Sequence, residues 1–178
     1  MSTYTYQSIE LSPAELSSRV LASSIQTPLE YVSTLADSVT ITFDGELSAP
    51  DLATLDGLLV TAALASSKRN KFDEIDARTE ELIATGYVFA GKVFSLSANA
   101  QKYWIGLVVG KDMMTYPLAV NTLDDSSTYD IQDAATVVGM YATAMGTVKA
   151  RLGSGTALKD LVRAATTIAE VDAVVDPR

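Results

Sequence analysis

The sequence predicts an α+β fold that is mainly a helical bundle with short β-hairpins, preceded by a small N-terminal α+β module. Three observations indicate this class. β-rich runs occur in the first third of the chain, two turn-rich segments interrupt the second half, and the segments between them have apolar residues at helical spacing. The chain has 178 residues, of which 48% are hydrophobic, so it is long enough and apolar enough to bury a core.

The N-terminal module is expected over residues 1–66. Alternation in TYTYQSIEL, residues 3–11, puts Tyr4, Tyr6 and Ser8 on one face and Ile9 on the other, which indicates a strand. A capping box follows, with Ser12 before Pro13 and Glu15 three residues after the serine; it predicts a helix over about residues 13–23.

The rest of this module is expected to be a hairpin followed by a helix. LEYVSTL and SVTITFDG are β-rich runs separated by Ala36 and Asp37, and the second run ends at Gly45. Ser48 or Asp51 then caps a helix that carries a row of leucines.

The second domain is expected over residues 67–178. The segment ASSKRNK, residues 65–71, passes from a nearly base-free part of the chain into a basic one, and it is expected to lie within a continuous or nearly continuous helix. Apolar residues at helical spacing continue to Ile83, and Gly86 stands where a helix ends with a residue of positive φ.

A tight hairpin is expected directly after this helix. YVFAGKVFSL alternates apolar residues around Ala90 and Gly91, and glycine supplies the left-handed conformation that such a turn requires. Gly86 and Gly91 are therefore the candidate turn glycines. Ser97 caps the next helix, which carries Trp104 inward.

Four aromatic residues in this region are the candidate core or interface. Two interpretations are open, a packed mini-core and a ligand-binding corner. A ligand pocket would need convergent polar groups, and helical phase turns Gln101 and Lys102 away from the tryptophan, which favours the core. The four residues are Phe89, Phe94, Tyr103 and Trp104.

A second hairpin is expected over residues 116–131, with its turn at Asp124 and Asp125. The paired aspartates raise the alternative of a calcium loop. Such a loop would require glycine and glutamate where this chain has Tyr129 and Ala135, so turn chemistry is favoured and no metal or other cofactor is expected.

A long uncharged helix is expected from Ile131 to Leu152. Its apolar residues alternate steps of three and four, like a coiled-coil seam, and the candidate interface residues Val138, Tyr141 and Met145 belong to this row. Two arrangements remain open, burial within the chain's own bundle and burial against symmetry-related copies. We expect a homo-oligomer, with a trimer as the leading possibility. The GSG at 153–155 is expected to end the helix, and Thr156 to cap a last one.

Composition excludes several function classes. The chain has no His and no Cys, which removes Ser-His-Asp and Cys-His catalysis and ordinary zinc sites. Its formal net charge is −9, and residues 1–67 hold one base, Arg19, against eight acids. Because affinity for nucleic acid depends on Lys and Arg, no nucleic-acid partner is expected for this acidic protein.

A membrane partner is not expected either. The first fifteen residues have neither a basic start nor an apolar stretch typical of a secretory signal. The longest strongly apolar uncharged run, residues 134–148, is shorter than the roughly 20 residues that cross a bilayer.

The stretch IDARTEELIATGYVFAGKVFSLSANAQKYWIGL resembles a domain of unknown function that recurs in tail-fibre and related virion structural proteins of tailed bacteriophages. The resemblance extends over about residues 68–170 and includes RLGSGTALKDLVRAA at 151–165. FDGELSAPDLATLDGLLV, in the first domain, is also similar to a module of phage virion proteins. The matching positions of the larger pattern are Ile75, Arg78, Leu82, Gly86, Gly91, Phe94 and Ser95.

The resemblance implies a non-enzymatic virion structural protein, located in the virion after synthesis in the host cytoplasm. A tail accessory protein, a fibre adaptor and a head fibre or head decoration subunit all fit, and other virion proteins are the expected partners in assembly. The N-terminal module would serve docking to the virion or to a partner. The alternatives are a tail-fibre assembly chaperone and a carboxylate-based glycan hydrolase; the acids available to the latter crowd one helix, as Glu74, Asp76, Glu80 and Glu81.

Overall fold

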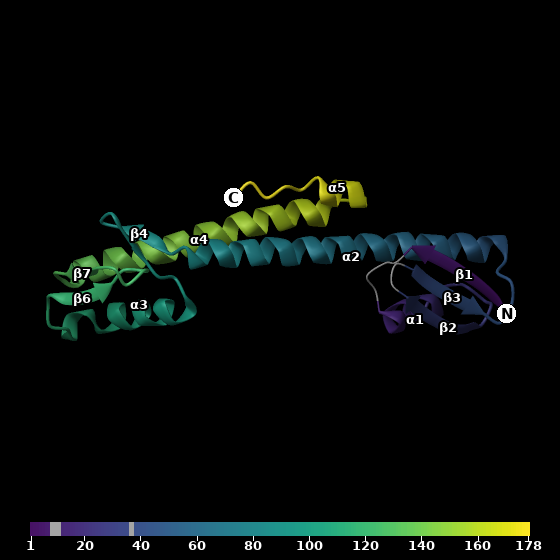
Figure 1. The fold of residues 1–178 in the computed structure, drawn as a ribbon, viewed down its shortest axis with the longest axis horizontal. Coiled ribbons are helices and arrows are strands. Elements are labelled where there is room, and N and C mark those ends of the chain that lie inside the picture. The colour runs from purple at the N-terminus through teal and green to yellow at the C-terminus, as the bar shows by residue number, and fades with distance from the viewer. Residues whose placement is uncertain (8–11, 36–37) are drawn as a thin grey trace. The chain divides into compact units, whose positions relative to one another are not determined.

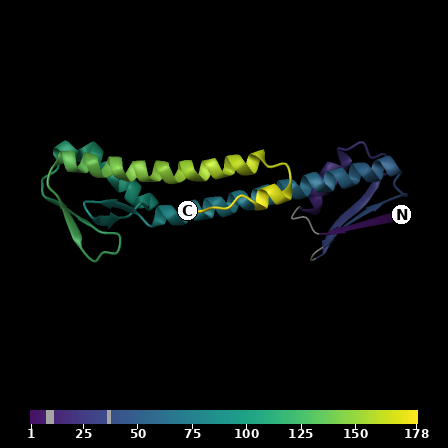
Figure 2. The same cartoon turned by 90° about the horizontal axis from the view of Figure 1, so that it is seen from above.

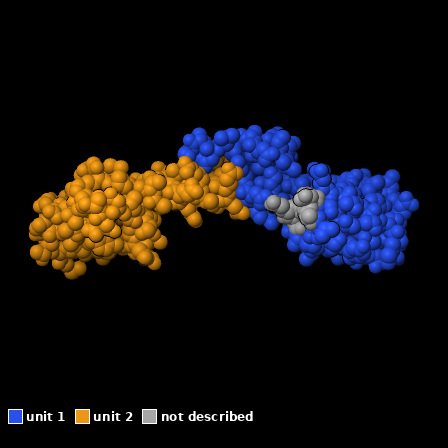
Figure 3. Space-filling model, in the orientation of Figure 1, with its two compact units in different colours: residues 1–72, 161–178 blue, residues 73–160 orange. Residues whose placement is uncertain are grey.

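The computed structural model describes residues 1–7, 12–35 and 38–178 and divides them into two compact units. The first unit combines residues 1–72 with residues 161–178, and the second contains residues 73–160 (Figure 3). Helices dominate and the strands form small antiparallel sheets, which confirms the predicted α+β class.

A three-stranded antiparallel sheet forms one layer of the first unit. Its strands are β1 (Ser2–Gln7), β2 (Leu29–Leu35) and β3 (Ser38–Phe43), in the order β1-β3-β2 (Figure 1). The structure thus confirms the strand expected at the N-terminus over residues 2–7 and the two strands of the hairpin. The remainder of the expected first strand, Ser8 and Ile9 included, and the turn residues Ala36 and Asp37 lie outside the described residues.

Helix α1 (Pro13–Leu21) begins where the capping box places it. The Ser12 hydroxyl accepts a hydrogen bond from the backbone N–H of Glu15 at 3.1 Å, and Pro13 occupies the first turn. Leu16 and Val20 are buried against β3, whose alternate residues Val39 and Ile41 are fully buried. Together with leucines from the next helix they form the core of this unit.

Helix α2 (Ala49–Ala84) is a single element that runs through the expected boundary between residues 66 and 67. Its N-terminus is capped by Ser48, whose hydroxyl accepts from the N–H of Asp51 at 3.3 Å. The two compact units divide inside this helix, between residues 72 and 73.

The second unit packs two hairpins and a helix against the beginning of a long helix (Figures 1 and 2). The first hairpin and helix confirm the arrangement predicted after Gly86, and the second hairpin confirms the one predicted around Asp124. The elements are β4 (Tyr87–Phe89), β5 (Lys92–Phe94), α3 (Ala98–Gly110), the 3-10 helix η1 (Lys111–Met113), β6 (Leu118–Asn121), β7 (Thr128–Ile131) and α4 (Ala134–Ala164).

The predicted break at residues 153–155 is wrong, because α4 continues through it to Ala164. Glycine inside a helix costs only about 1 kcal/mol relative to alanine, and this stretch has no proline to remove a backbone donor. Thr156 is not an N-cap; its hydroxyl donates to the carbonyl of Leu152, as interior helical threonines do.

The C-terminal residues belong to the first unit, whereas the sequence predicted residues 67–178 as one domain. The Lys68 ammonium donates to the carbonyl of Arg163 at 2.9 Å, and the Arg163 guanidinium lies 5.4 Å from the centre of the Phe72 ring. A short helix, α5 (Ile168–Asp172), follows with a complete capping box formed by Thr167 and Glu170.

The last residues of the sequence contain a local ion pair. The Arg178 guanidinium donates to the Asp176 carboxylate at 2.6 Å, and both side chains are largely buried. The sequence does not predict this pair, because two residues this close in an extended segment have no periodic signature.

Candidate functional site

The candidate residues of the second unit are positioned by two glycines, which both have the positive φ that the sequence predicted. Gly86 has φ 79° and ends α2, and a Cβ at this position would lie 2.2 Å from the carbonyl oxygen of Phe94. Gly91 has φ 76° and follows Ala90, which has φ 48°. Two successive left-handed residues are typical of the type I′ turn of a tight hairpin, so these glycines set where β4 and β5 lie.

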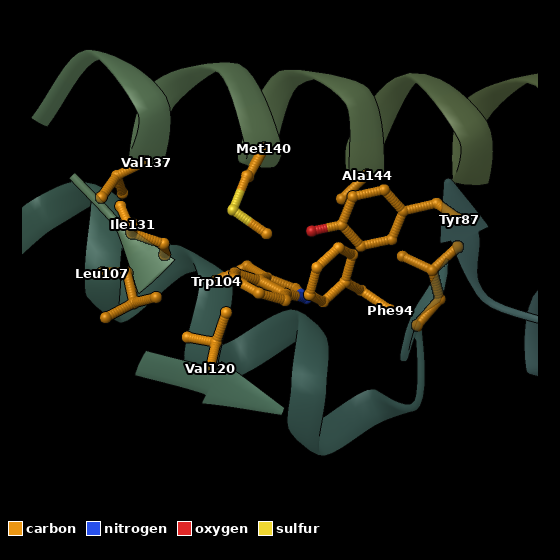
Figure 4. Close-up of a cluster of buried hydrophobic side chains, with 10 residues drawn as sticks. Tyr87, Phe94, Trp104, Leu107, Val120, Ile131, Val137, Met140 and Ala144 are labelled. Atoms are coloured by element: carbon orange, nitrogen blue, oxygen red, sulfur yellow. The ribbon is translucent and has the colours of Figure 1, made fainter. Parts of the chain in front are cut away.

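The aromatic side chains of the β4–β5 hairpin lie in one cluster. Tyr87 lies opposite Phe94 in the antiparallel register, so both rings stand on the same face of the hairpin. The ring centroids of Tyr87 and Phe94 are 5.7 Å apart, and those of Phe94 and Trp104 are 6.1 Å apart (Figure 4). We call the aromatic cluster the residues Tyr87, Phe89, Phe94, Trp104 and Tyr129, which contact one another edge to face or at a tilt.

Trp104 lies at the centre of this cluster and is buried against the hairpin, as the sequence predicted. Only 4% of it is exposed, and its indole N–H donates to the carbonyl of Ser95 at 3.2 Å. The interaction satisfies its single polar atom, so Trp104 packs as a core residue.

Tyr103 does not belong to the buried core, although the sequence grouped it with Trp104. It is 47% exposed, and its ring meets the ring of Trp104 edge to face. Adjacent residues of a helix point about 100° apart, so only one of the two can face inward. Phe89 is half-buried and contacts Tyr129, whereas Phe94 is completely buried.

Sequence reasoning missed Tyr87 and Tyr129 as members of the cluster. The signal for Tyr87 was present, because a two-residue turn at Ala90 and Gly91 pairs position 87 with position 94. The Tyr87 hydroxyl is buried and has no hydrogen-bond partner among the described residues. Burial raises the pKa of this phenol well above its ordinary value.

Helix α4 presents a different face to the core from the one predicted. The buried row is Val137, Met140 and Ala144, on the helix along the top of Figure 4. Of the predicted row, Val138 is 41% exposed, whereas Tyr141 and Met145 are half-buried and pack at the margin of the same cluster. The predicted seam is therefore displaced by one residue from the row that is most deeply buried.

A shallow hollow of about 370 Å³ adjoins the aromatic cluster. Its lining offers hydroxyl and amide groups but neither an acid nor a base. The lining residues are Ser95, Ala100, Tyr103, Trp104, Ala119, Val120 and Asn121.

Several of the carboxylates singled out by the sequence are engaged in turns or ion pairs. Hydrogen bonds from Thr122 and Ser126 lower the pKa of Asp124 to about 2, which is the chemistry of a turn. On α2, Asp76 pairs with Lys159 and Glu81 pairs with Arg78. Among residues 1–7, 12–35 and 38–178, no group of three or more acids could hold a metal ion.

No protein-family model, curated protein sequence or solved structure matches this chain. In the described part of the chain, no helix combines the length and the apolar character needed to cross a bilayer.

Proposed function

We propose that this chain is a non-enzymatic structural protein of a tailed-bacteriophage particle, made in the host cytoplasm and acting through contacts with other virion proteins. The observation that carries the proposal is the resemblance of residues 68–170 to a domain of phage virion structural proteins. A tail accessory protein, a fibre adaptor and a head fibre or decoration subunit are the roles that fit.

The structural role of the matching positions supports this proposal. Gly86 and Gly91 have left-handed backbone, and Ile75 and Phe94 are almost completely buried. A pattern made of such residues specifies an architecture instead of a reaction. The positions that carry the resemblance are thus positions that shape the helix end and the hairpin.

The surface of α4 supports assembly as the mode of action. Between Asp133 and Lys149 the helix has no charged residue, and its outward row is Ala135, Val138, Ala142 and Gly146. The hydroxyls of Thr143 and Thr147, on the same helix, donate to backbone carbonyls four residues earlier at 2.9 Å. Both hydroxyl hydrogens are therefore already hydrogen-bonded within the helix. Packing another helix against this surface would leave neither donor without a partner.

We extend the proposal to self-association through α4, with a trimer as the expected state. A closed ring of copies buries equivalent patches together, and the small outward residues allow close approach of helices. Since Tyr141 and Met145 pack partly within their own chain, the contact is expected to centre on Val138 and Ala142.

Mass spectrometry of purified particles tests the virion role. We expect stoichiometric recovery of the chain from mature particles. Recovery from assembling lysates with absence from mature particles would instead identify an assembly chaperone.

A glycan-turnover assay on host envelope polysaccharide tests the absence of catalysis. We expect no cleavage, because Asp76 and Glu81 are both engaged in ion pairs on α2 and the hollow beside Trp104 offers no acid. Cleavage that survives purification would overturn the non-enzymatic assignment.

A further inference from the structure

The two edges of the sheet in the first unit differ in how they are protected. At one edge, the register of β2 shifts between Leu29 and Tyr31, around the charged Glu30. At the other edge, β1 pairs with β3 through six consecutive residues without a shift, and its sequence STYTYQ has neither charge nor proline. Bulges, charges and prolines are the usual devices that prevent an edge strand from pairing with another chain. β1 has none of these devices, whereas β2 has two.

The outer edge of β1 presents backbone groups that suit another strand. In an antiparallel strand, alternate residues direct their N–H and C=O groups to the paired neighbour and the others direct theirs outward. Within the described residues, β1 pairs only with β3, and no further backbone hydrogen bond reaches residues 2–7 (Figure 1). An extended peptide is the ligand whose chemistry matches such a row.

The side chains of β1 are also arranged for strand addition. Thr3, Thr5 and Gln7 are exposed on one face, whereas Tyr4 and Tyr6 are half-buried on the other. The Tyr4 hydroxyl accepts from the N–H of Leu47 at 2.9 Å, so this strand is held firmly on its own unit. A strand that is already ordered loses little conformational entropy when a partner strand adds to it.

Among the described residues, two exposed acids lie beside β1. Asp56 accepts a hydrogen bond from the Tyr6 hydroxyl at 3.0 Å. Glu46 precedes Leu47, the residue that donates to Tyr4. In the part of the chain that the structure describes, no cation pairs with either of these two acids.

We propose that the outer edge of β1 is a docking site for an extended segment of another protein, with uncharged central residues and lysine or arginine flanking them. The segment adds to the sheet as a further strand and its cations meet the acids around β1. A partner of this chemistry fits better than a second copy, because residues 1–67 carry a net charge of −7 and would repel each other. The proposal goes beyond the virion role and holds for any assembly partner.

Amide hydrogen exchange of the full chain, followed by NMR, tests this site. The probe is a short synthetic peptide of alternating valine and threonine with lysine at both ends. Two control peptides are used. In one the lysines are replaced by glutamate, and in the other alternate backbone nitrogens are methylated. We expect the lysine peptide to slow exchange at alternate residues of β1 while β2 is unaffected, and both control peptides to bind more weakly.

Charge variants separate the acids around β1 from general acidity. Asp56→Asn and Glu46→Gln are each expected to weaken peptide binding about two- to fivefold, as exposed ion pairs do. Glu30→Gln, an equal change of charge at the opposite edge, is the matched control and is expected to leave binding unchanged.

Several results would overturn the proposal. They are unchanged exchange of β1 at saturating peptide, equal binding of the glutamate peptide, and equal effects of Glu30→Gln and Glu46→Gln. Protection of β1 that grows with protein concentration in the absence of peptide would assign the edge to a second copy. Recovery of the chain from particles is independent of all of these results, so failure of this site is distinguishable from failure of the virion role.

Discussion

Trp104 and Tyr103 are adjacent in sequence, and their different burial separates a core role from a surface role. Trp104→Ala removes a ring that is 96% buried in contact with the hairpin, and it is expected to lower the free energy of unfolding by about 3 to 5 kcal/mol. Tyr103→Ala, at a nearly half-exposed position, is the control and is expected to cost much less. Chemical denaturation measures both. Unchanged stability of Trp104→Ala with loss of partner binding would assign Trp104 to an interface instead.

The Tyr87 hydroxyl is the one buried side-chain polar atom without a partner in the described part of the chain, and Figure 4 places it beside Met140 and Ala144. A buried unsatisfied hydroxyl costs about 1 to 3 kcal/mol. Tyr87→Phe is therefore expected to raise the free energy of unfolding by about 1 kcal/mol. Tyr116→Phe, which removes a 2.8 Å hydrogen bond to the carbonyl of Lys111, is expected to lower it by a similar amount. A lower free energy of unfolding for Tyr87→Phe would contradict the absence of a hydrogen-bond partner for this hydroxyl.

Burial of Tyr87 also predicts the pH dependence of stability. Its pKa in the folded chain is raised, whereas in the unfolded chain it titrates near the ordinary value of about 10. The unfolded state then releases the proton first, so titration of Tyr87 leaves the free energy of unfolding unchanged below about pH 10 and lowers it as the pH rises above that value. Denaturation from pH 8 to pH 11, roughly the window around that value, should show a shallower alkaline decline in Tyr87→Phe. Parallel curves for the two proteins would contradict this.

At the scale of single elements, α4 illustrates why the sequence misplaced the buried face. Val137, Met140 and Ala144 are spaced by three and four residues, and so are Val138, Tyr141 and Met145. The two rows differ by one residue, or about 100° around the helix. Because both are apolar, periodicity cannot choose between them, and the aromatic cluster selects the first.

The continuity of α4 through residues 153–155 gives an element-scale prediction. A Cβ at Gly153 would meet no atom within 4 Å, and its φ is not positive. Gly153→Ala is therefore expected to raise the free energy of unfolding by up to about 1 kcal/mol. Gly57→Ala, at an equally open position of α2, is the matched control and should behave alike. Destabilisation by Gly153→Ala alone would indicate a helix end at this position.

At the scale of the whole molecule, light scattering of the full chain tests self-association. We expect the mass of a trimer. Val138→Lys is expected to dissociate it, because the substitution brings like charges of neighbouring copies together in the contact. Because Val138 is 41% exposed in the single chain, this substitution should leave the stability of the dissociated chain nearly unchanged. Val109→Lys, at an exposed position of α3, is the control and should remain associated. A monomer at high concentration would rule the trimer out.

The sequence by itself determined the elements whose cause is local. Ser12 and Ser97 accept hydrogen bonds from N–H groups three residues later, and Gly86 and Gly91 adopt the left-handed backbone that glycine favours. These signals act within a few residues, so they can be seen without knowing what packs against them. Together with the β-rich runs, the turn residues and the helical spacing of apolar residues, they predicted the fold class, the three hairpins and the burial of Trp104.

Only the tertiary structure decided which surfaces meet. It selected the Met140 face of α4, carried that helix through the glycines that predicted its end, and joined residues 161–178 to the first unit. It also brought Tyr129 to Phe94, from a hairpin more than thirty residues away in sequence. The physical reason is that burial free energy depends on the apolar area that two elements cover together. A residue row that is apolar on its own therefore does not say which neighbour will cover it.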